Sequence, residues 1–215
     1  MRTLLLALAA LASAAPVAAQ QHSHGQPAQQ QAPDHAKYPD GWAVRVDRDA
    51  PADNVWLMAH GNELHASTGP VGAVYFHRDW TRAGDYAFSV RFRQPKASEH
   101  PEGYGLMIGG AELTGAEQRY SYFLIRQTGE YFIADRRGEV RTPLVDWTPH
   151  AAIRKFEDGT EAENVLGVAV QGNEVVFSVN GQEVARRPKD DLSTEGLAGF
   201  RVNHNLELFI APGQA

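Results

Sequence analysis

The sequence contains no cysteine. This absence excludes disulfide bonds, and it also removes the acceptor that a lipid anchor of the lipoprotein kind requires. Any folded part of this chain therefore has to be held together by its core alone.

The sequence also lacks a basic block and the usual motifs of nucleotide chemistry. Its formal net charge is −6 at pH 7, and because the charges are dispersed, a nucleic-acid partner is not expected. It has no glycine-flanked serine nucleophile, no phosphate-binding glycine loop and no dinucleotide fingerprint. The glycines of GYGLMIGG, at residues 103–110, alternate as in a strand that a neighbour approaches closely.

A long apolar run occurs only at the start of the chain. Residues 3–19, TLLLALAALASAAPVAA, follow Arg2 and place Val17 and Ala19 at the −3 and −1 positions of a cleavage site. This pattern predicts a signal peptide over residues 1–19, because its leucine-rich part is too short to span ~30 Å of hydrocarbon. We expect an exported protein, periplasmic or extracellular, with no membrane insertion.

The next segment, residues 20–40, is rich in Gln, Pro and His and has little to bury, so we predict a flexible leader. Short runs of β-branched and aromatic residues then alternate with Gly, Asn, Asp and Pro as far as residue 212. That spacing predicts one all-β sandwich domain over residues 41–212, with little helix. The best helical candidate, residues 151–163, is short and charged.

One hairpin can be placed in register from the sequence. A turn at Gly172-Asn173 pairs Val170 with Val175, and further along Val168 with Phe177 and Leu166 with Val179, which gives one wholly apolar face. The dipeptide Asn180-Gly181 suits a second turn with positive φ, so a third strand is expected to follow.

A second hairpin spans residues 119–138, RYSYFLIRQTGEYFIADRRG. A two-residue turn at Thr128-Gly129 would pair Ile125 with Phe132 and Phe123 with Ala134 on a core face. The opposite face would then carry rings and hydrogen-bonding groups, as sugar-binding and peptide-binding grooves do. A solvated strand face without a ligand is the alternative. The residues expected on this face are Tyr120, Tyr122, Arg126, Tyr131 and Asp135.

The predicted last strand adds two candidates to this face, and a predicted loop adds a third. In GLAGFRVNHN, Ala198, Phe200 and Val202 share one side, which leaves Arg201 and Asn203 on the groove side. Trp147 lies in a predicted loop after the hairpin, where it could flank the groove or pack beneath the loop.

Catalytic and metal-binding alternatives have weaker support. Glycosidases need two carboxyl groups at a defined spacing, yet only Asp135, with Glu130 and Asp146 behind it, is a candidate. Among the histidines, the sequence does not show whether His60, His65 and His77 meet. We predict no metal, no cofactor and no catalytic residue, and the oligomeric state is open.

Five segments resemble exported bacterial proteins of the concanavalin A-like lectin/glucanase superfamily, related to laminin G-like and 3-keto-disaccharide hydrolase-like domains. They are HASTGP (65–70), GYGLMIGG (103–110), YSYFLIRQTGEYFI (120–133), VVFSVNGQEV (175–184) and GLAGFRVNHNL (196–206). The resemblance implies a jelly roll of two antiparallel sheets, one curved to hold a glycan. We expect a non-catalytic module that binds an oligo- or polysaccharide; a glycoside hydrolase or keto-disaccharide hydrolase-like enzyme and a structural module of the cell envelope are the alternatives.

Overall fold

The computed structural model describes residues 38–47, 55–157 and 159–213. The predicted signal peptide and all but the end of the predicted leader lie outside these residues. Tyr38 already packs against the core, and its hydroxyl donates a hydrogen bond to the carbonyl of Val55 at 3.2 Å. Tyr38, which the sequence placed in the leader, is thus part of the packed domain.

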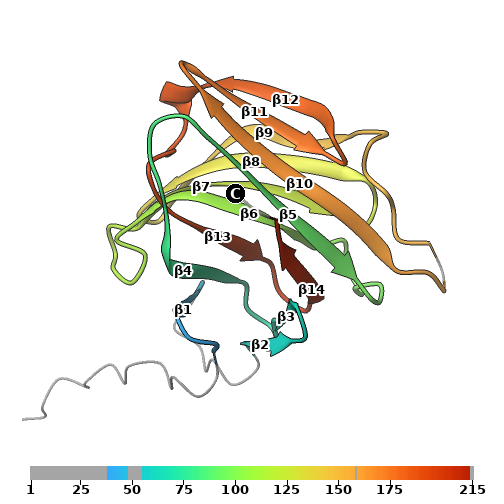
Figure 1. The fold of residues 1–215 in the computed structure, drawn as a ribbon. Coiled ribbons are helices and arrows are strands. Elements are labelled where there is room, and N and C mark those ends of the chain that lie inside the picture. The colour runs from blue at the N-terminus through green and yellow to red at the C-terminus, as the bar shows by residue number, and fades with distance from the viewer. Residues whose placement is uncertain (1–37, 48–54, 158, 214–215) are drawn as a thin grey trace, which may run out of the picture. The chain divides into compact units, whose positions relative to one another are not determined.

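The described residues form two antiparallel sheets of seven strands each, which lie one in front of the other in Figure 1. Sheet A contains, in spatial order, β1 (Trp42–Val46), β4 (Ala73–Arg82), β13 (Gly196–Val202), β6 (Gly103–Ala111), β7 (Arg119–Arg126), β8 (Glu130–Arg137) and β9 (Val140–Pro149). Sheet B contains β12 (Gln182–Pro188), β11 (Glu174–Val179), β10 (Ala162–Gln171), β5 (Tyr86–Gln94), β14 (Glu207–Pro212), β3 (Glu63–Ser67) and β2 (Trp56–His60).

Helix is nearly absent from the described residues, where the short 3₁₀ turn η3 (Lys189–Asp191) follows β12. The predicted fold class, a jelly-roll β-sandwich of two antiparallel sheets, is confirmed. In the described part of the chain, no helix has the length and apolar character needed to cross a bilayer.

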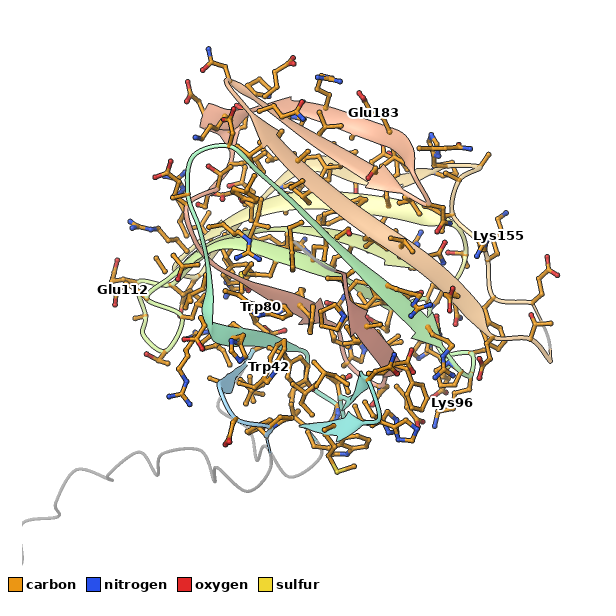
Figure 2. The ribbon with its side chains drawn as sticks, in the orientation of Figure 1. Trp42, Trp80, Lys96, Glu112, Lys155 and Glu183 are labelled. Carbon is orange, nitrogen blue, oxygen red and sulfur yellow. The ribbon has the colours of Figure 1, made fainter. Side chains whose placement is uncertain are left out.

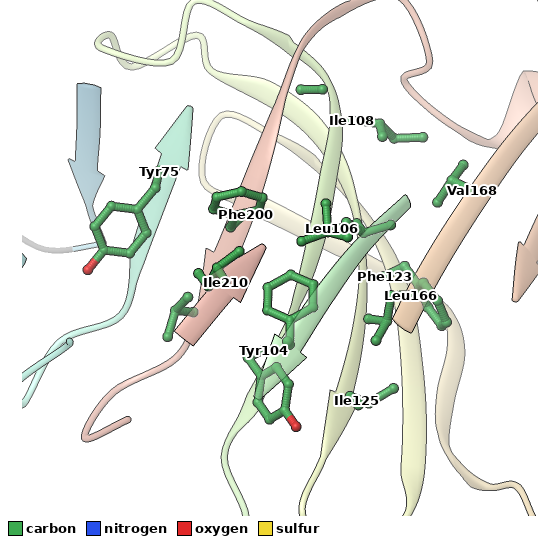
Figure 3. Packing of buried hydrophobic residues seen from close by; sticks show 14 of the residues in the cluster. Tyr75, Tyr104, Leu106, Ile108, Phe123, Ile125, Leu166, Val168, Phe200 and Ile210 are labelled. Atoms are coloured by element: carbon green, nitrogen blue, oxygen red, sulfur yellow. The ribbon is translucent and has the colours of Figure 1, made fainter. Parts of the chain in front are cut away.

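The main core lies between the inner faces of the two sheets, as Figure 3 shows. Tyr104, Phe123 and Phe200 of sheet A meet Leu166 and Ile210 of sheet B, and each of these side chains is at most 1% exposed. Because side chains alternate along a strand, the sequence neighbours of these residues on sheet A point to the other face of that sheet, called here the outer face.

The hairpin of β10 and β11 has the predicted register, with Val170 opposite Val175 and Leu166 opposite Val179. The Asn180-Gly181 turn also forms, with φ of 51° and 80° at its two residues. Two positive φ values match the right-handed twist of the flanking strands, which explains why this dipeptide could be read from the sequence. Ala198, Phe200 and Val202 share the inner face, as predicted.

The predicted register of the β7–β8 hairpin is wrong by one residue. Its loop has three residues, since β7 ends at Arg126 and β8 begins at Glu130. The amide of Gly129 bonds back to the carbonyl of Arg126 at 2.9 Å, and Gly129 alone in the loop has a positive φ, 88°. A two-residue turn would have required a positive φ at Thr128, which a β-branched residue avoids.

This shift moves every side chain of β8 to the face opposite the predicted one. Tyr131 and Ile133 join the core, opposite Ile125 and Phe123, so Tyr131 does not belong to the expected groove. Asp135 also leaves that face: it is 5% exposed and accepts hydrogen bonds from the Ser121 hydroxyl at 2.7 Å and the Ser193 amide at 3.1 Å.

The tryptophans of β1 and β4 close one end of the core. Trp42 and Trp80 are labelled next to each other in Figure 2, and their ring centroids are 5.0 Å apart. Trp42 also stacks on Phe200, with ring centroids 5.1 Å apart, and the centroid of the His77 ring lies 5.4 Å from that of Trp42. These two indoles therefore support the fold.

Candidate functional site

The outer face of sheet A carries a row of rings across three neighbouring strands. The centroids of Tyr120 and Tyr122 on β7 are 5.8 Å apart, those of Tyr122 and Phe132 on β8 are 6.0 Å apart, and those of Phe132 and Trp147 on β9 are 5.2 Å apart. Buried residues such as Met107 and Leu124 fill the space around them in a second apolar cluster. The sequence GEYFI on β8 thus places Tyr131 in the core and Phe132 on this face.

A pocket of about 260 Å³ opens over these rings. Its apolar lining is made by Trp147, which is partly exposed, and by Tyr122, Leu124 and Phe132, which are at most 6% exposed; its polar lining includes three arginines and two carboxylates. The residues around it are Asp47, Pro70, Gly72, Glu102, Tyr122, Leu124, Phe132, Arg136, Arg141, Trp147, Arg201, Asn203 and His204. They come from both ends of the chain, because β13 lies between β4 and β6 in the sheet.

Arg201 and Asp47 form a bidentate ion pair in the pocket wall. Burial, the largest single influence, acts to lower the pKa of Arg201, but the hydrogen bonds and charge of Asp47 together with the nearby phenols of Tyr120 and Tyr122 raise the pKa above its usual value. Burial likewise acts to raise the pKa of Asp47, and the bonds with Arg201 hold that pKa below its usual value. Both groups therefore stay charged at neutral pH. A Cβ at Gly72 would lie 2.6 Å from Asp47 Oδ2, so glycine there leaves room for the pair.

Trp147 lies against the sheet because Gly103 has no side chain. A Cβ at that position would lie 2.9 Å from Cη2 of Trp147 and 3.0 Å from Cδ1 of Leu124. The guanidinium of Arg126 covers the indole at 4.5 Å and is held by Glu130, to which Arg126 Nε donates at 2.7 Å. The ring is thus held in place by the sheet and by the guanidinium, and it stays partly exposed.

Four of the eight predicted ligand-binding residues, Tyr122, Trp147, Arg201 and Asn203, line the pocket. Trp147 does so from strand β9 and not from the predicted loop. Tyr120 is on the same face, but it is 1% exposed and packs in a cluster with Leu113, outside the pocket.

Arg126 does not line the pocket, but its guanidinium contacts Trp147, which does. Tyr131 and Asp135 belong to the opposite face, as described above. The expected groove therefore exists in part, but with a different set of residues around Tyr122.

The sequence interpretation missed Asp47, Glu102, Phe132, Arg136 and Arg141. Phe132 and Arg136 follow directly from the corrected hairpin register, so a three-residue loop would have revealed them. Arg141 required β9 to be recognised as a strand. Asp47 and Glu102 have no local signal, since only the packing of distant loops brings them to the pocket.

Two of the carboxylates that the sequence offered for catalysis, Glu130 and Asp135, form hydrogen bonds with other groups of the protein. Hydrogen bonds from Arg126 and then Thr128 lower the pKa of Glu130 from 4.5 to about 2, so this group stays ionised and cannot act as a general acid near neutral pH. Asp135 is bound by Ser121, Ser193 and Arg137. In the pocket itself, Asp47 is paired with Arg201, and Glu102 Oε1 lies 3.1 Å from His204 Nε2.

The side chains of His60, His65 and His77 do not come together at one site. His60 and His65 lie on sheet B, with centroids 6.2 Å apart, and both contact Phe209. His77 instead lies beside Trp42 on sheet A. Within the described ranges, no three side chains of His, Asp or Glu gather as they would around a metal ion.

Comparison with known proteins shows the fold. Three similar solved structures are the carbohydrate-binding module CBM66 from Bacillus subtilis, the β-glucanase of Bacillus licheniformis and the exoplasmic/lumenal domain of VIP36 in a Ca²⁺/Man2-bound form. Their TM-scores are 0.58, 0.53 and 0.52, and their identities are 9%, 10% and 9%. The match covers 79%, 81% and 81% of this chain and 91%, 91% and 82% of theirs.

All three have the concanavalin A-like jelly-roll fold, which is therefore the fold of this chain as well. No family model matches the sequence, and no curated protein does. At these identities the comparison carries the architecture and not the site, so the function has to be argued from the pocket.

Proposed function

We propose that this protein is an exported, non-catalytic module that binds a glycan in the pocket on the outer face of sheet A. The observation that carries the proposal is the combination of Trp147, which is partly exposed, with the largely buried rings of Tyr122 and Phe132 and with arginine, asparagine and carboxylate groups around one opening. Flat rings cover the apolar C–H faces of a sugar, and the polar groups bond its hydroxyls. The names of two similar structures, a carbohydrate-binding module and a mannose-bound domain, support the same class of ligand.

The dimensions favour a small contact and a modest affinity. A pocket of about 260 Å³ is below the ~300–1,000 Å³ range of sites for drug-sized ligands, so it fits one sugar unit or a chain end. Each ring contributes ~1 kcal/mol and each satisfied hydrogen bond ~1 kcal/mol. We therefore expect dissociation constants in the micromolar to millimolar range.

Binding without hydrolysis is supported by the state of the carboxylates. A glycosidase needs one carboxyl group that is protonated when the leaving group departs. Asp47 has a depressed pKa and is held by Arg201, which suits a hydrogen-bond acceptor for hydroxyl groups. Glu102 contacts His204, which makes it a second acceptor at the rim.

The test is isothermal titration calorimetry of the mature protein against a panel of neutral and acidic oligosaccharides, with the variants Trp147→Ala and Trp56→Ala. Trp56 is a matched control, since it is also partly buried but lies on β2 of sheet B, away from the pocket. We expect Trp147→Ala to weaken binding about tenfold, which corresponds to ~1.4 kcal/mol, and Trp56→Ala to leave it unchanged. Binding of no glycan, or equal effects of the two variants, would overturn the proposal.

A further inference from the structure

Two arginines face each other directly at the pocket. Arg136 on β8 is the register partner of Arg141 on β9, and both side chains line the pocket. Like charges directly opposite on neighbouring strands destabilise a sheet. A chain whose net charge is −6 has more acidic than basic residues, so this juxtaposition is not a consequence of overall composition.

Neither arginine has a carboxylate partner among the described residues. Arg136 Nε donates to the carbonyl of Gly138 at 3.0 Å, which positions its guanidinium, and the guanidinium of Arg141 lies 5.6 Å from the centroid of Phe132. A second opposed pair, Arg119 on β7 and Arg137 on β8, differs in this respect, because Arg137 donates to Asp135 at 2.9 Å. Of these two pairs, the one at the pocket is the pair in which neither arginine has a carboxylate partner among the described residues.

Other groups of the pocket do not cancel this charge. Asp47 is already neutralised by Arg201, and Glu102 is next to His204. The Nε of Arg201 is buried and has no acceptor in the described part of the chain. The phenol of Tyr122 lies in the field of all three pocket arginines, which oppose the rise in its pKa that burial causes.

We propose that the pocket selects an acidic saccharide, with the carboxylate of a uronic-acid unit bound between Arg136 and Arg141. This inference rests on the proposed glycan binding and names its ligand class. The planar guanidinium presents paired N–H donors that match the two oxygens of a carboxylate. The sugar ring of the same unit contacts Trp147, which is partly exposed and is backed by the buried ring of Phe132, with centroids 5.2 Å apart.

A carboxylate is favoured over a sulfate by the neighbouring rings. A C5 carboxylate is attached directly to the pyranose ring, so the charged group and the C–H face stay within one unit. A pocket of about 260 Å³ that combines two arginines with an aromatic base needs such a compact arrangement. The rings Phe132 and Trp147 and the arginines then act on the same sugar.

The experiment rests on one pair of ligands, oligogalacturonate and its methyl ester, which share the same sugar backbone and differ mainly in charge. Oligogalacturonate, its fully methyl-esterified form, neutral galacto-oligosaccharide and sulfated dextran oligosaccharide are titrated into the wild type, Arg141→Gln and Arg186→Gln. Arg186 is the control, because it is an exposed arginine on β12 bound by Glu174 and Glu183, outside the pocket. Thermal unfolding of each free variant is recorded in parallel.

We expect oligogalacturonate to bind about tenfold or more tightly than its methyl ester, and this preference to shrink as NaCl rises from about 0.02 M to about 0.5 M. Arg141→Gln should remove most of the preference and leave the melting temperature equal or higher, because an opposed charge is lost. Arg186→Gln should preserve the preference. A structural role for Arg141 would lower the melting temperature and leave the charge preference intact, which would contradict the proposal.

The possible failures are distinguishable. Equal binding of the free acid, the ester and the neutral sugar would overturn the acidic ligand and leave glycan binding standing. Preference for the sulfated sugar over oligogalacturonate would overturn the carboxylate. Binding of none of the four ligands, together with none of the wider panel, would overturn the proposed function as well.

Discussion

Single residues without side chains shape this pocket as much as the rings do. Gly103 and Gly72 lie where a Cβ would touch Trp147 and Asp47, so each clears space for a neighbour that lines the pocket. Neither has a positive φ, and both are therefore required for close approach and not for backbone conformation. Their role depends entirely on which strand lies beside them.

We predict that the single substitution Gly103→Ala weakens glycan binding severalfold or more. The new methyl would lie 2.9 Å from Cη2 of Trp147, so the indole has to move off the sheet. Gly115→Ala is the control, because its Cβ would find no atom closer than 3.7 Å. Calorimetry and tryptophan fluorescence give the readout; unchanged binding in Gly103→Ala would show that the position of the indole does not matter.

Among the elements, the hairpin of β11 and β12 has a turn that depends on one residue. The β11–β12 turn rests on Asn180, whose side chain accepts from the Val165 amide at 2.9 Å and donates to the Ala152 carbonyl at 2.8 Å. The Asn180 amide group also reaches Asn164 Oδ1, at 2.9 Å. One residue thus sets the turn and connects it to β10 and the loop before it.

We predict that Asn180→Ala lowers the free energy of unfolding by ~2–3 kcal/mol. About 1 kcal/mol comes from positive φ in a residue that tolerates it poorly, and the rest from lost hydrogen bonds. Asn205→Ala is a matched comparison, since Asn205 has φ of 54° and an exposed side chain. Urea denaturation should give only ~1 kcal/mol for Asn205→Ala; equal losses in both variants would exclude a contribution of the side-chain hydrogen bonds.

For the whole molecule, stability depends on carboxylates that are ionised and paired in the folded state. Asp47, Glu130 and Glu207 all have pKa values below their usual range. For Asp47, burial opposes the bonds with Arg201, and for Glu207 the bond from Lys96 is the main cause. A carboxyl group whose pKa is lower when folded stabilises the fold above its unfolded pKa, and this stabilisation is lost as the pH falls toward the folded value.

The clearest case is Glu130, with a folded pKa of about 2 against ~4.3 when unfolded. We predict that the wild type melts at a higher temperature than Glu130→Gln at pH 7, and that this difference falls steadily between about pH 5 and pH 2. Glu183→Gln, which removes an exposed partner of Arg186 on β12, is the control (Figure 2) and should shift the melting temperature little at any pH. A constant difference for Glu130→Gln across this range would contradict the lowered pKa.

Local patterns in the sequence were enough for the architecture and for part of the site. Alternation along the strands identified the inner faces of β7, β10, β11 and β13, and Gly172-Asn173 and Asn180-Gly181 determined two turns because Gly172, Asn180 and Gly181 adopt a positive φ. Tyr122, Arg201 and Asn203 were placed on the right face for the same reason. The loop before β8 was misread because the choice between two and three residues depends on Thr128, and the strand β9 lacks a strong alternating pattern.

The sequence by itself determined that this chain makes a two-sheet β-sandwich with one aromatic outer face, because strand propensity and side-chain alternation are local properties. The tertiary structure alone decided which charges meet that face. Asp47 reaches Arg201 across 154 positions of the chain, and Arg136 meets Arg141 only through the pairing of β8 with β9. Strand order and register set these contacts, and both depend on how the whole sheet assembles.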